Sequence, residues 1–241
     1  MTDSLTIAHC SDIHLDADHR DMQFYRDAFG RVLEEIRKHQ PDLLLIAGDI
    51  FDANDASDAT IRWAMETLAA QPTPIAMIPG NHDCLEGDSI YKRYDFDAID
   101  NVDMLIAPEG ELRHLPGLNT AIWAKGMLDH NPDHRPIDGA PTRPDGCRWY
   151  IGMGHGLYVP AGQSTDRSSP IPHADVAVCP FDYLALGHHH AALTIDTERG
   201  AAAFCGSPTD SVGGGATYAM ARLSDQGVSV DVLTVPEFVD G

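Results

Sequence analysis

Apolar residues recur along this chain with two alternating periods, one typical of strands and one typical of helices. Leu5 to Cys10 is a short alternating run, and Leu43 to Ile46 is a nearly continuous apolar run, as in a central strand covered on both faces. Between them, the apolar side chains from Met22 to His39 have helical spacing, and Pro41 ends that helix. Strand followed by helix, repeated, predicts a layered α/β domain.

The pattern continues through the rest of the chain. Ala59 to Ala70 predicts a second helix and Pro74 to Ile78 a third strand, while Trp149 to Met153 and Tyr183 to Leu186 predict two more strands. The segment from Met127 to Gly146 is rich in Pro, Asp and Gly and has no apolar period. We therefore expect a long surface segment there, which could overhang a site at the strand ends.

The C-terminal part alternates from Tyr218 to Val232 around Asp225-Gln226-Gly227, which predicts an antiparallel hairpin. With 241 residues and no internal repeat or linker, the chain suits a single domain over residues 1–241. No apolar run approaches the ~20 residues needed to span a bilayer. We therefore expect no membrane contact and a cytoplasmic location.

The charge balance limits the partners of the chain. Asp and Glu outnumber Lys and Arg by 37 to 16, which gives a formal net charge of −21 at pH 7. A surface that grips duplex DNA normally carries a basic patch, and no cluster of Lys and Arg exists here. We therefore expect weak intrinsic binding of duplex DNA, so that any nucleic-acid contact depends on arginines, metals or a partner subunit.

Potential metal ligands follow five of the predicted strands. In open α/β sheets, ligands bind at the carboxyl ends of the strands, where the loops converge. The five loops are Asp12-Ile13-His14, Gly48-Asp49-Ile50-Phe51-Asp52, Gly80-Asn81-His82-Asp83, Gly154-His155 and Gly187-His188-His189-His190. Carboxylate, imidazole and amide oxygen suit manganese, iron or zinc, and the number of donors predicts two ions. The five cysteines are widely spaced without a CxxC pair, so they predict neither a disulfide framework nor a zinc knuckle.

Each of these loops also has a purely structural interpretation. An isolated Asp-x-His or Gly-Asp after a strand is usually a turn, because Gly supplies unusual dihedral angles and Asp bonds its own backbone. The occurrence of all five loops together favours a functional site, since independent turns have no reason to supply ligands for two ions in a fixed order. His130 and His134 have the spacing of a helical metal pair, but Pro132 argues against a helix, so we expect both to be solvated.

With these motifs the chain resembles the calcineurin-like metallophosphoesterase superfamily, whose signature is Asp-x-His, Gly-Asp-x-x-Asp, Gly-Asn-His-Asp/Glu, a later His and Gly-His-x-His. The resemblance extends from Asp12 to His190 and keeps the order of the motifs. It implies a two-sheet β-sandwich flanked by helices, and the chain length leaves little room for a capping domain. It also implies two divalent metal ions, with manganese as the first expectation and iron, zinc, nickel or cobalt as alternatives.

The family pattern assigns roles residue by residue. It puts one metal on Asp12, His14, Asp49 and His190, and the other on Asp49, Asn81, His155 and His188. It makes His82 the non-ligand histidine and Asp52 the acid that orients it. The resemblance therefore implies a hydroxide, activated by both metals, as the nucleophile, and His82 as the general acid toward the leaving oxygen.

Some stretches look more specifically like the nuclease subunit of SbcCD-type DNA repair exonucleases. They are His14-Leu15, Gly48 to Asp52, Tyr183 to His188 and Cys205-Gly206-Ser207-Pro208. This narrower resemblance implies an ATPase partner, whereas the acidity of the chain departs from what duplex binding requires.

Three functions remain open at this stage. The first is a metal-dependent phosphoester hydrolase, a phosphodiesterase rather than a monoesterase, acting on a substrate such as a nucleotide or a single-stranded nucleic acid. The second is an SbcD-like DNA exonuclease that needs an ATPase partner to supply the missing basic surface. The third is a non-catalytic scaffold, against which the intact ligand set argues.

Overall fold

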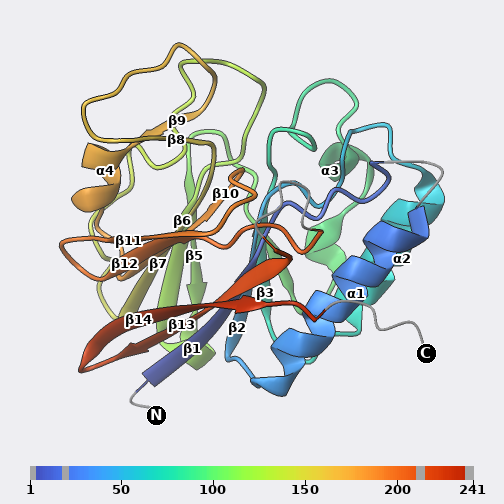
Figure 1. Ribbon diagram of the computed structural model, residues 1–241. Coiled ribbons are helices and arrows are strands. Elements are labelled where there is room, and N and C mark those ends of the chain that lie inside the picture. Colours follow the sequence, from blue (N-terminus) through green and yellow to red (C-terminus); the bar gives the residue numbers. More distant parts are fainter. Residues whose placement is uncertain (1–3, 18–21, 210–214, 237–241) are drawn as a thin grey trace.

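The computed structural model describes residues 4–17, 22–209 and 215–236. They form two six-stranded sheets that pack face to face, with three helices on the outside of one sheet and a short helix on the outside of the other (Figure 1). Within the described ranges, no helix is both long enough and apolar enough to cross a membrane.

The first sheet has the strand order β14-β13-β1-β2-β3-β4. Its strands are β1 (Ser4–Cys10), β2 (Leu43–Ala47), β3 (Ile75–Ile78), β4 (Val102–Met104), β13 (Thr217–Ser224) and β14 (Gly227–Thr234). β1 to β4 are parallel, because helical crossovers connect them, whereas β13 pairs antiparallel with both β1 and β14. The crossover helices are α1 (Met22–Lys38), α2 (Asp58–Ala69), α3 (Ile90–Arg93) and the 3-10 turn Phe96–Ala98.

The second sheet has the strand order β11-β12-β10-β7-β6-β5. Its strands are β5 (Glu111–Leu115), β6 (Thr120–Ala124), β7 (Trp149–His155), β10 (Tyr183–Gly187), β11 (Leu193–Asp196) and β12 (Ala201–Phe204). The four central strands are parallel and the two edge strands are antiparallel to their neighbours. The remaining elements are the parallel pair β8 (Leu157–Val159) and β9 (Pro170–Pro172), the helix α4 (His173–Ala177) and the 3-10 turn Pro116–Leu118.

Three apolar clusters hold these layers together. One lies between α1, α2 and the first sheet and contains Phe29, Leu33 and Ile61. A second lies between the two sheets, where Leu45 and Tyr183 are fully buried. A third covers the outer face of the second sheet beneath α4 and the neighbouring loops. β2, β7 and β10 are therefore buried along their whole length, as their nearly continuous apolar sequences indicate.

The predictions on fold are confirmed. The expected β-sandwich flanked by helices is present, each predicted strand and helix occurs within a few residues of its expected bounds, and the C-terminal hairpin is β13 and β14. Residues 127–146 contain no helix or strand, as expected. The five metal-donor loops all leave their sheets at the edge where the parallel strands end, so the fold gathers them in one place.

Candidate metal centre

Three neighbouring strands of the first sheet and two of the second deliver the predicted ligands. β1, β2 and β3 lead into Asp12, Asp49 and Asn81, while β7 ends at His155 and β10 is followed by His188. The two sheets touch at this edge, because the ring Nδ1 of His155 donates to the carbonyl oxygen of Ala47 at 2.8 Å. The site is thus built across the seam between the sheets.

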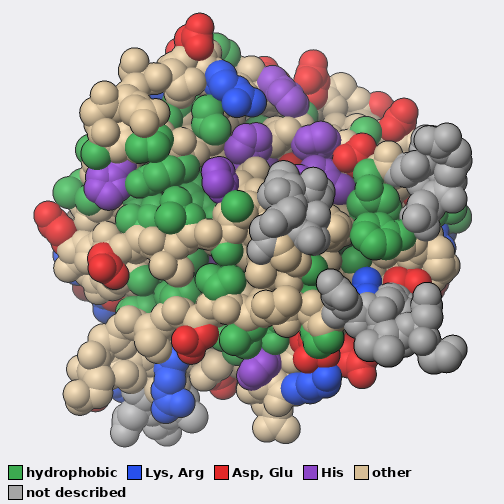
Figure 2. All heavy atoms as spheres, in the orientation of Figure 1, with side chains coloured by type: hydrophobic (Ala, Val, Ile, Leu, Met, Phe, Trp, Pro, Cys, Tyr) green, Lys and Arg blue, Asp and Glu red, His purple; other side chains and the backbone are tan. Residues whose placement is uncertain are grey.

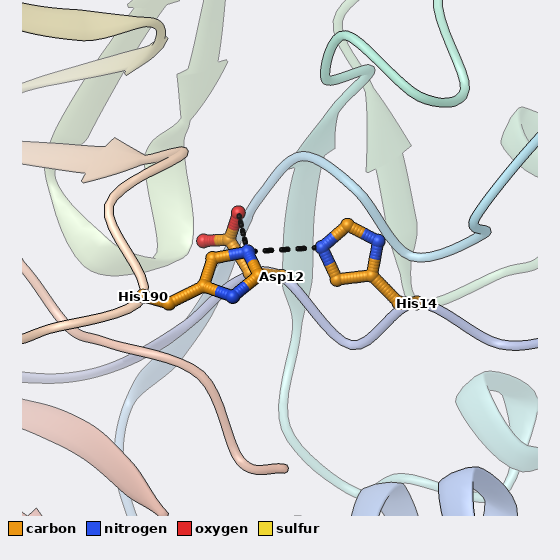
Figure 3. Close-up of side chains that lie close together, drawn as sticks. All are labelled: Asp12, His14 and His190. Atoms are coloured by element: carbon orange, nitrogen blue, oxygen red, sulfur yellow. Dashed lines mark hydrogen bonds and ion pairs between the residues drawn. The ribbon is translucent and has the colours of Figure 1, made fainter. Parts of the chain in front are cut away.

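Asp12, His14 and His190 form the first group of donors (Figure 3). The Nε2 atoms of the two histidines face each other at 3.1 Å, and a carboxylate oxygen of Asp12 lies 3.6 Å from the Nε2 of His190. Asp12 is fully buried and accepts from the backbone N–H of His188 at 3.1 Å and from the hydroxyl of Ser11. The carboxylate therefore has a fixed orientation toward the ring of His190.

Asp49, His155 and His188 form the second group of donors, which Asn81 joins. The Oδ2 atom of Asp49 lies 3.2 Å from the Nε2 of His155. The Oδ1 atom of Asn81 lies 2.9 Å from the same Nε2 and 2.8 Å from the Nδ1 of His188. Because Asp49 Oδ2 is also 3.9 Å from the Nε2 of His14, this carboxylate stands between the two groups.

The backbone at the site adopts a conformation that residues other than glycine rarely adopt. Asp12, His14, Asp49 and His188 all have positive φ, between 54° and 95°. Residues held in this region cost about 1–3 kcal/mol each and cluster at functional sites. The loops stay in place because the backbone N–H groups of Asp12 and His14 donate to the carbonyls of Gly48 and Asp49 at 3.1 Å. The fold thus stabilises a costly backbone that turns these side chains toward one another.

Burial and neighbouring charges shift the ionisation of the donors. Burial, strengthened by the charge of Asp49, raises the pKa of Asp12 to about 7. Burial alone would lower the pKa of His155, but the adjacent Asp49 carboxylate raises it to about 9, and the same pairing outweighs burial in lowering the pKa of Asp49. Burial lowers the pKa of both His188 and His190 to about 4, so these rings are neutral at pH 7 and offer lone pairs.

The donor set fits divalent cations. The Nδ1 of His155 donates to Ala47, so in the neutral ring the Nε2 carries a lone pair. Because the pKa of His155 is raised to about 9, that Nε2 carries a proton at pH 7, directed at the Asn81 amide oxygen and the Asp49 carboxylate, which both lie within 3.2 Å. A divalent cation can replace this proton, since a metal binds the deprotonated ligand. His14 repeats the arrangement, because its Nδ1 lies 3.0 Å from a carboxylate oxygen of Asp52 and its Nε2 faces His190. Converging lone pairs repel unless a positive species lies between them, and nitrogen with oxygen donors suits first-row divalent metals.

His82 lies at the exposed side of this centre. Its Nδ1 donates to the backbone carbonyl of Asp52 at 2.7 Å and is 3.6 Å from the Asp52 carboxylate. The Asp52 carboxylate is closer to His14 than to His82, so it contacts a predicted ligand as well as the histidine it was expected to orient. A His82 ring nitrogen also lies within 4.8 Å of donor atoms of His14 and Asp49, which leaves His82 able to reach a metal bound there.

Several supporting residues lie outside the predicted ligand set. The Asp83 carboxylate accepts from the backbone N–H groups of Gly80 and Ile50, so it stabilises two of the donor loops. The Ser207 hydroxyl donates to the carbonyl oxygen of Asp12 at 2.7 Å, which gives the Cys205-Gly206-Ser207-Pro208 stretch a role in supporting the site.

His130 also contacts the site, which its sequence context does not predict. The residue is exposed, as expected, but its ring donates through Nε2 to the Asn81 carbonyl at 2.7 Å. No spacing rule links His130 to Asn81, since the two belong to separate loops. The interpretation of His130 as only a solvated side chain is therefore incomplete.

Comparisons with known proteins agree with this geometry. A family model described as calcineurin-like phosphoesterase matches residues 5–192. The SbcCD nuclease subunit SbcD of Staphylococcus epidermidis is 25% identical over 222 residues, which cover 80% of this chain and 58% of that protein. The chain therefore spans less than two thirds of that relative's length.

Solved structures share the fold at low sequence identity. TT1561 of Thermus thermophilus is 10% identical with a TM-score of 0.62, covering 96% of this chain and 99% of its own. A dimetal phosphatase from Danio rerio is 12% identical with a TM-score of 0.54, covering 96% and 99%. GAP50, described as the anchor in the inner membrane complex of Plasmodium, is 12% identical with a TM-score of 0.53, covering 98% and 86%. The fold thus occurs in proteins of different roles, so the fold alone does not identify the family. The match to the family model over residues 5–192 does identify it. The chain belongs to the calcineurin-like phosphoesterases, a family of metal-dependent phosphoester hydrolases.

Proposed function

We propose that this chain is a two-metal phosphodiesterase. The observation that carries the proposal is the position of the Asp49 carboxylate, which lies 3.2 Å from the Nε2 of His155 and 3.9 Å from the Nε2 of His14. One carboxylate shared by two groups of donors provides for two cations side by side. One metal would be held by Asp12, His14, Asp49 and His190, and the other by Asp49, Asn81, His155 and His188.

Two divalent ions bound in this way supply a water of lowered pKa and neutralise charge on the phosphoryl group. The protein contributes the orientation of the donors and a proton for the leaving oxygen. His82 can deliver that proton, because its Nδ1 is engaged by the Asp52 carbonyl and its Nε2 is left to face substrate. Asp52 fixes the ring through that carbonyl, while its carboxylate fixes His14.

The preference for diesters rests on the similarity to a nuclease subunit. The same relative supports a second candidate, a DNA exonuclease that acts with an ATPase partner. The net charge of −21 favours small or single-stranded substrates for the isolated chain, because duplex binding needs a basic surface. Manganese is the expected metal, with iron, zinc, nickel and cobalt as alternatives.

Metal analysis combined with two model substrates tests the proposal. The purified protein is expected to bind two equivalents of metal and to hydrolyse bis(p-nitrophenyl) phosphate faster than p-nitrophenyl phosphate when manganese is added. If the protein bound no metal and hydrolysed neither substrate with any divalent ion, the proposal would be refuted and the non-catalytic scaffold would be the remaining interpretation. Vigorous hydrolysis of duplex DNA by the isolated chain at moderate salt would refute the argument from charge.

The role of His82 needs its own variant. His82→Asn is expected to keep both metals and to lower kcat by about 10²–10⁴-fold, as for the loss of a general acid. A control with Asn in place of exposed His189, whose Nδ1 bonds the Ala191 carbonyl, should change neither property. Loss of a metal in the His82 variant would instead identify His82 as a ligand, which its distance to His14 and Asp49 permits.

A further inference from the structure

A cavity of about 200 Å³ opens beside the second group of donors. Asn81 and His188 form the wall on the metal side, and Arg167, Ser168 and His130 bring polar groups to the rest of the wall. Its apolar lining comes from Met127 and Leu157. Two loops with no predicted ligand, residues 127–146 and 160–169, thus shape the space next to the candidate metal centre. Figure 2 shows several histidines gathered on the face that carries this edge of the sheets.

The loop that carries Arg167 is held close to the metal ligands. The backbone N–H of Leu157 donates to the Ser169 carbonyl at 2.9 Å, directly after His155 and Gly156. A Cβ atom on Gly156 would lie 2.1 Å from that carbonyl oxygen, so the close approach requires glycine at this position. This contact anchors Ser169, two residues after Arg167, next to His155.

Arg167 is the arginine that lines this cavity. Within the described ranges, its guanidinium makes no ion pair and no hydrogen bond, whereas Arg93, Arg113 and Arg143 all pair with carboxylates. Arg167 and His188 line the same cavity, so the guanidinium and the metal side face one space. An exposed arginine whose side chain has no partner among the described residues suits a phosphate oxygen when it lies beside a phosphoester site.

We propose that this cavity binds a second phosphate of the substrate, adjacent to the scissile one, and that Arg167 is the residue that selects for it. The inference rests on the proposed function, since the scissile phosphate is taken to lie at Asn81 and His188. The metal side, formed by Asn81 and His188, and the side formed by Arg167 belong to one cavity of about 200 Å³. This volume is smaller than the ~300–1,000 Å³ of pockets that bind larger ligands. A phosphate at Arg167 therefore lies close to the first, as neighbouring phosphates do in a nucleotide strand. Met127 and Leu157 suit the sugar between them.

Binding of two product-like nucleotides tests the inference without turnover. Thymidine 5′-monophosphate and thymidine 3′,5′-bisphosphate differ only in the second phosphate, and calorimetry in the presence of manganese gives their Kd values. The wild-type chain is expected to bind the bisphosphate at least about tenfold more tightly, which corresponds to about one charge-assisted contact. Arg167→Gln should reduce this preference to less than about threefold, and Arg167→Lys should retain part of it.

Arg199→Gln is the matched control. Arg199 is exposed in the turn before Ala201, and Ala201 pairs with Tyr183 at the opposite end of β10 from His188. This variant removes the same charge far from the cavity, so the preference for the bisphosphate should remain. An equal loss in both arginine variants would mean that net charge, and not the cavity, causes the preference, and would overturn the inference.

The outcomes separate the cavity from the proposed function. Hydrolysis of bis(p-nitrophenyl) phosphate without any preference of the wild-type chain for the bisphosphate would overturn the cavity assignment and leave the phosphodiesterase standing. A preference that depends on Arg167, in a chain that hydrolyses neither model ester, would support the cavity and remove the catalytic proposal. Failure to bind the bisphosphate at all would overturn the cavity assignment regardless of activity.

Discussion

His9 gives a quantitative test of the packing between the two sheets. The side chain is fully buried in β1, its Nδ1 lies 2.9 Å from the hydroxyl of Tyr183 in the second sheet, and its Nε2 has no partner among the described residues. Burial lowers the pKa of His9 to about 3, compared with the ordinary value of 6.5 for histidine. The folded protein therefore keeps this ring neutral at a pH where the unfolded chain binds a proton.

The effect on stability follows from linkage. A histidine whose pKa is lowered on folding contributes stability that is present above its unfolded pKa and is lost as the pH falls through 6.5 toward 3. At pH 5 the loss amounts to about 2 kcal/mol, because each pH unit below the unfolded pKa costs about 1.4 kcal/mol. Substituting His9 with a residue that does not titrate removes this loss.

Urea unfolding of metal-free protein at about pH 7.5 and about pH 5 measures the difference. His9→Asn is expected to be less stable than wild type at the higher pH, because the smaller side chain leaves a void, but to lose about 2 kcal/mol less between the two pH values. Tyr183→Phe is the control, since it removes the hydrogen bond while His9 stays buried, so its loss should match wild type. The same pH dependence in wild type and His9→Asn would refute the assignment of a buried neutral ring.

Four further outcomes follow from the site. Asp49→Asn should reduce the metal content measured by elemental analysis from two equivalents to one or none, because both donor groups share that carboxylate. Ser207→Ala should weaken metal affinity in a chelator competition by about 10–100-fold, as for other supports of a ligand, through loss of the 2.7 Å bond to the Asp12 carbonyl. Gly187→Ala should lower the free energy of unfolding in urea by about 1–3 kcal/mol, because a Cβ there would lie 1.9 Å from the Ala47 oxygen. Chelation should lower the Tm in calorimetry, and adding manganese back should restore it, since ligands that bind only the folded state stabilise it.

The residues that converge at the candidate metal centre are easier to predict from the sequence than some of the strands are. The ligands follow strands that are buried on both faces, so each appears as a polar residue directly after an apolar run, as Asp49 does after Leu43–Ala47. β12 has no such signal, because Ala201, Ala202 and Ala203 favour a helix by intrinsic propensity. Only its place between β10 and β11 makes this segment a strand, since small buried side chains fit there.

Contacts between separate loops are equally hidden from the sequence. The sequence predicts only a solvated side chain for His130 and no role for Arg167, yet both line the cavity beside Asn81. Neither residue belongs to a periodic pattern, so only the three-dimensional path of residues 127–146 and 160–169 brings them together. The geometry of Asp52 is hidden in the same way, because its carboxylate is closer to His14 than to His82.

Because the candidate metal centre lies where the two sheets meet, the packing of the core between the sheets affects the distances between its donors. Asp12, Asp49 and Asn81 follow strands of one sheet, whereas His155, His188 and His190 belong to the other, so the gap between the sheets sets the separation of the donors. Small residues fill part of that gap, among them Ala76, Ala124 and Ala185. Enlarging one of them would increase the distance between the donors of the two sheets without changing any donor residue. The apolar volume between the sheets therefore affects the geometry of the candidate metal centre as well as the donor residues themselves do.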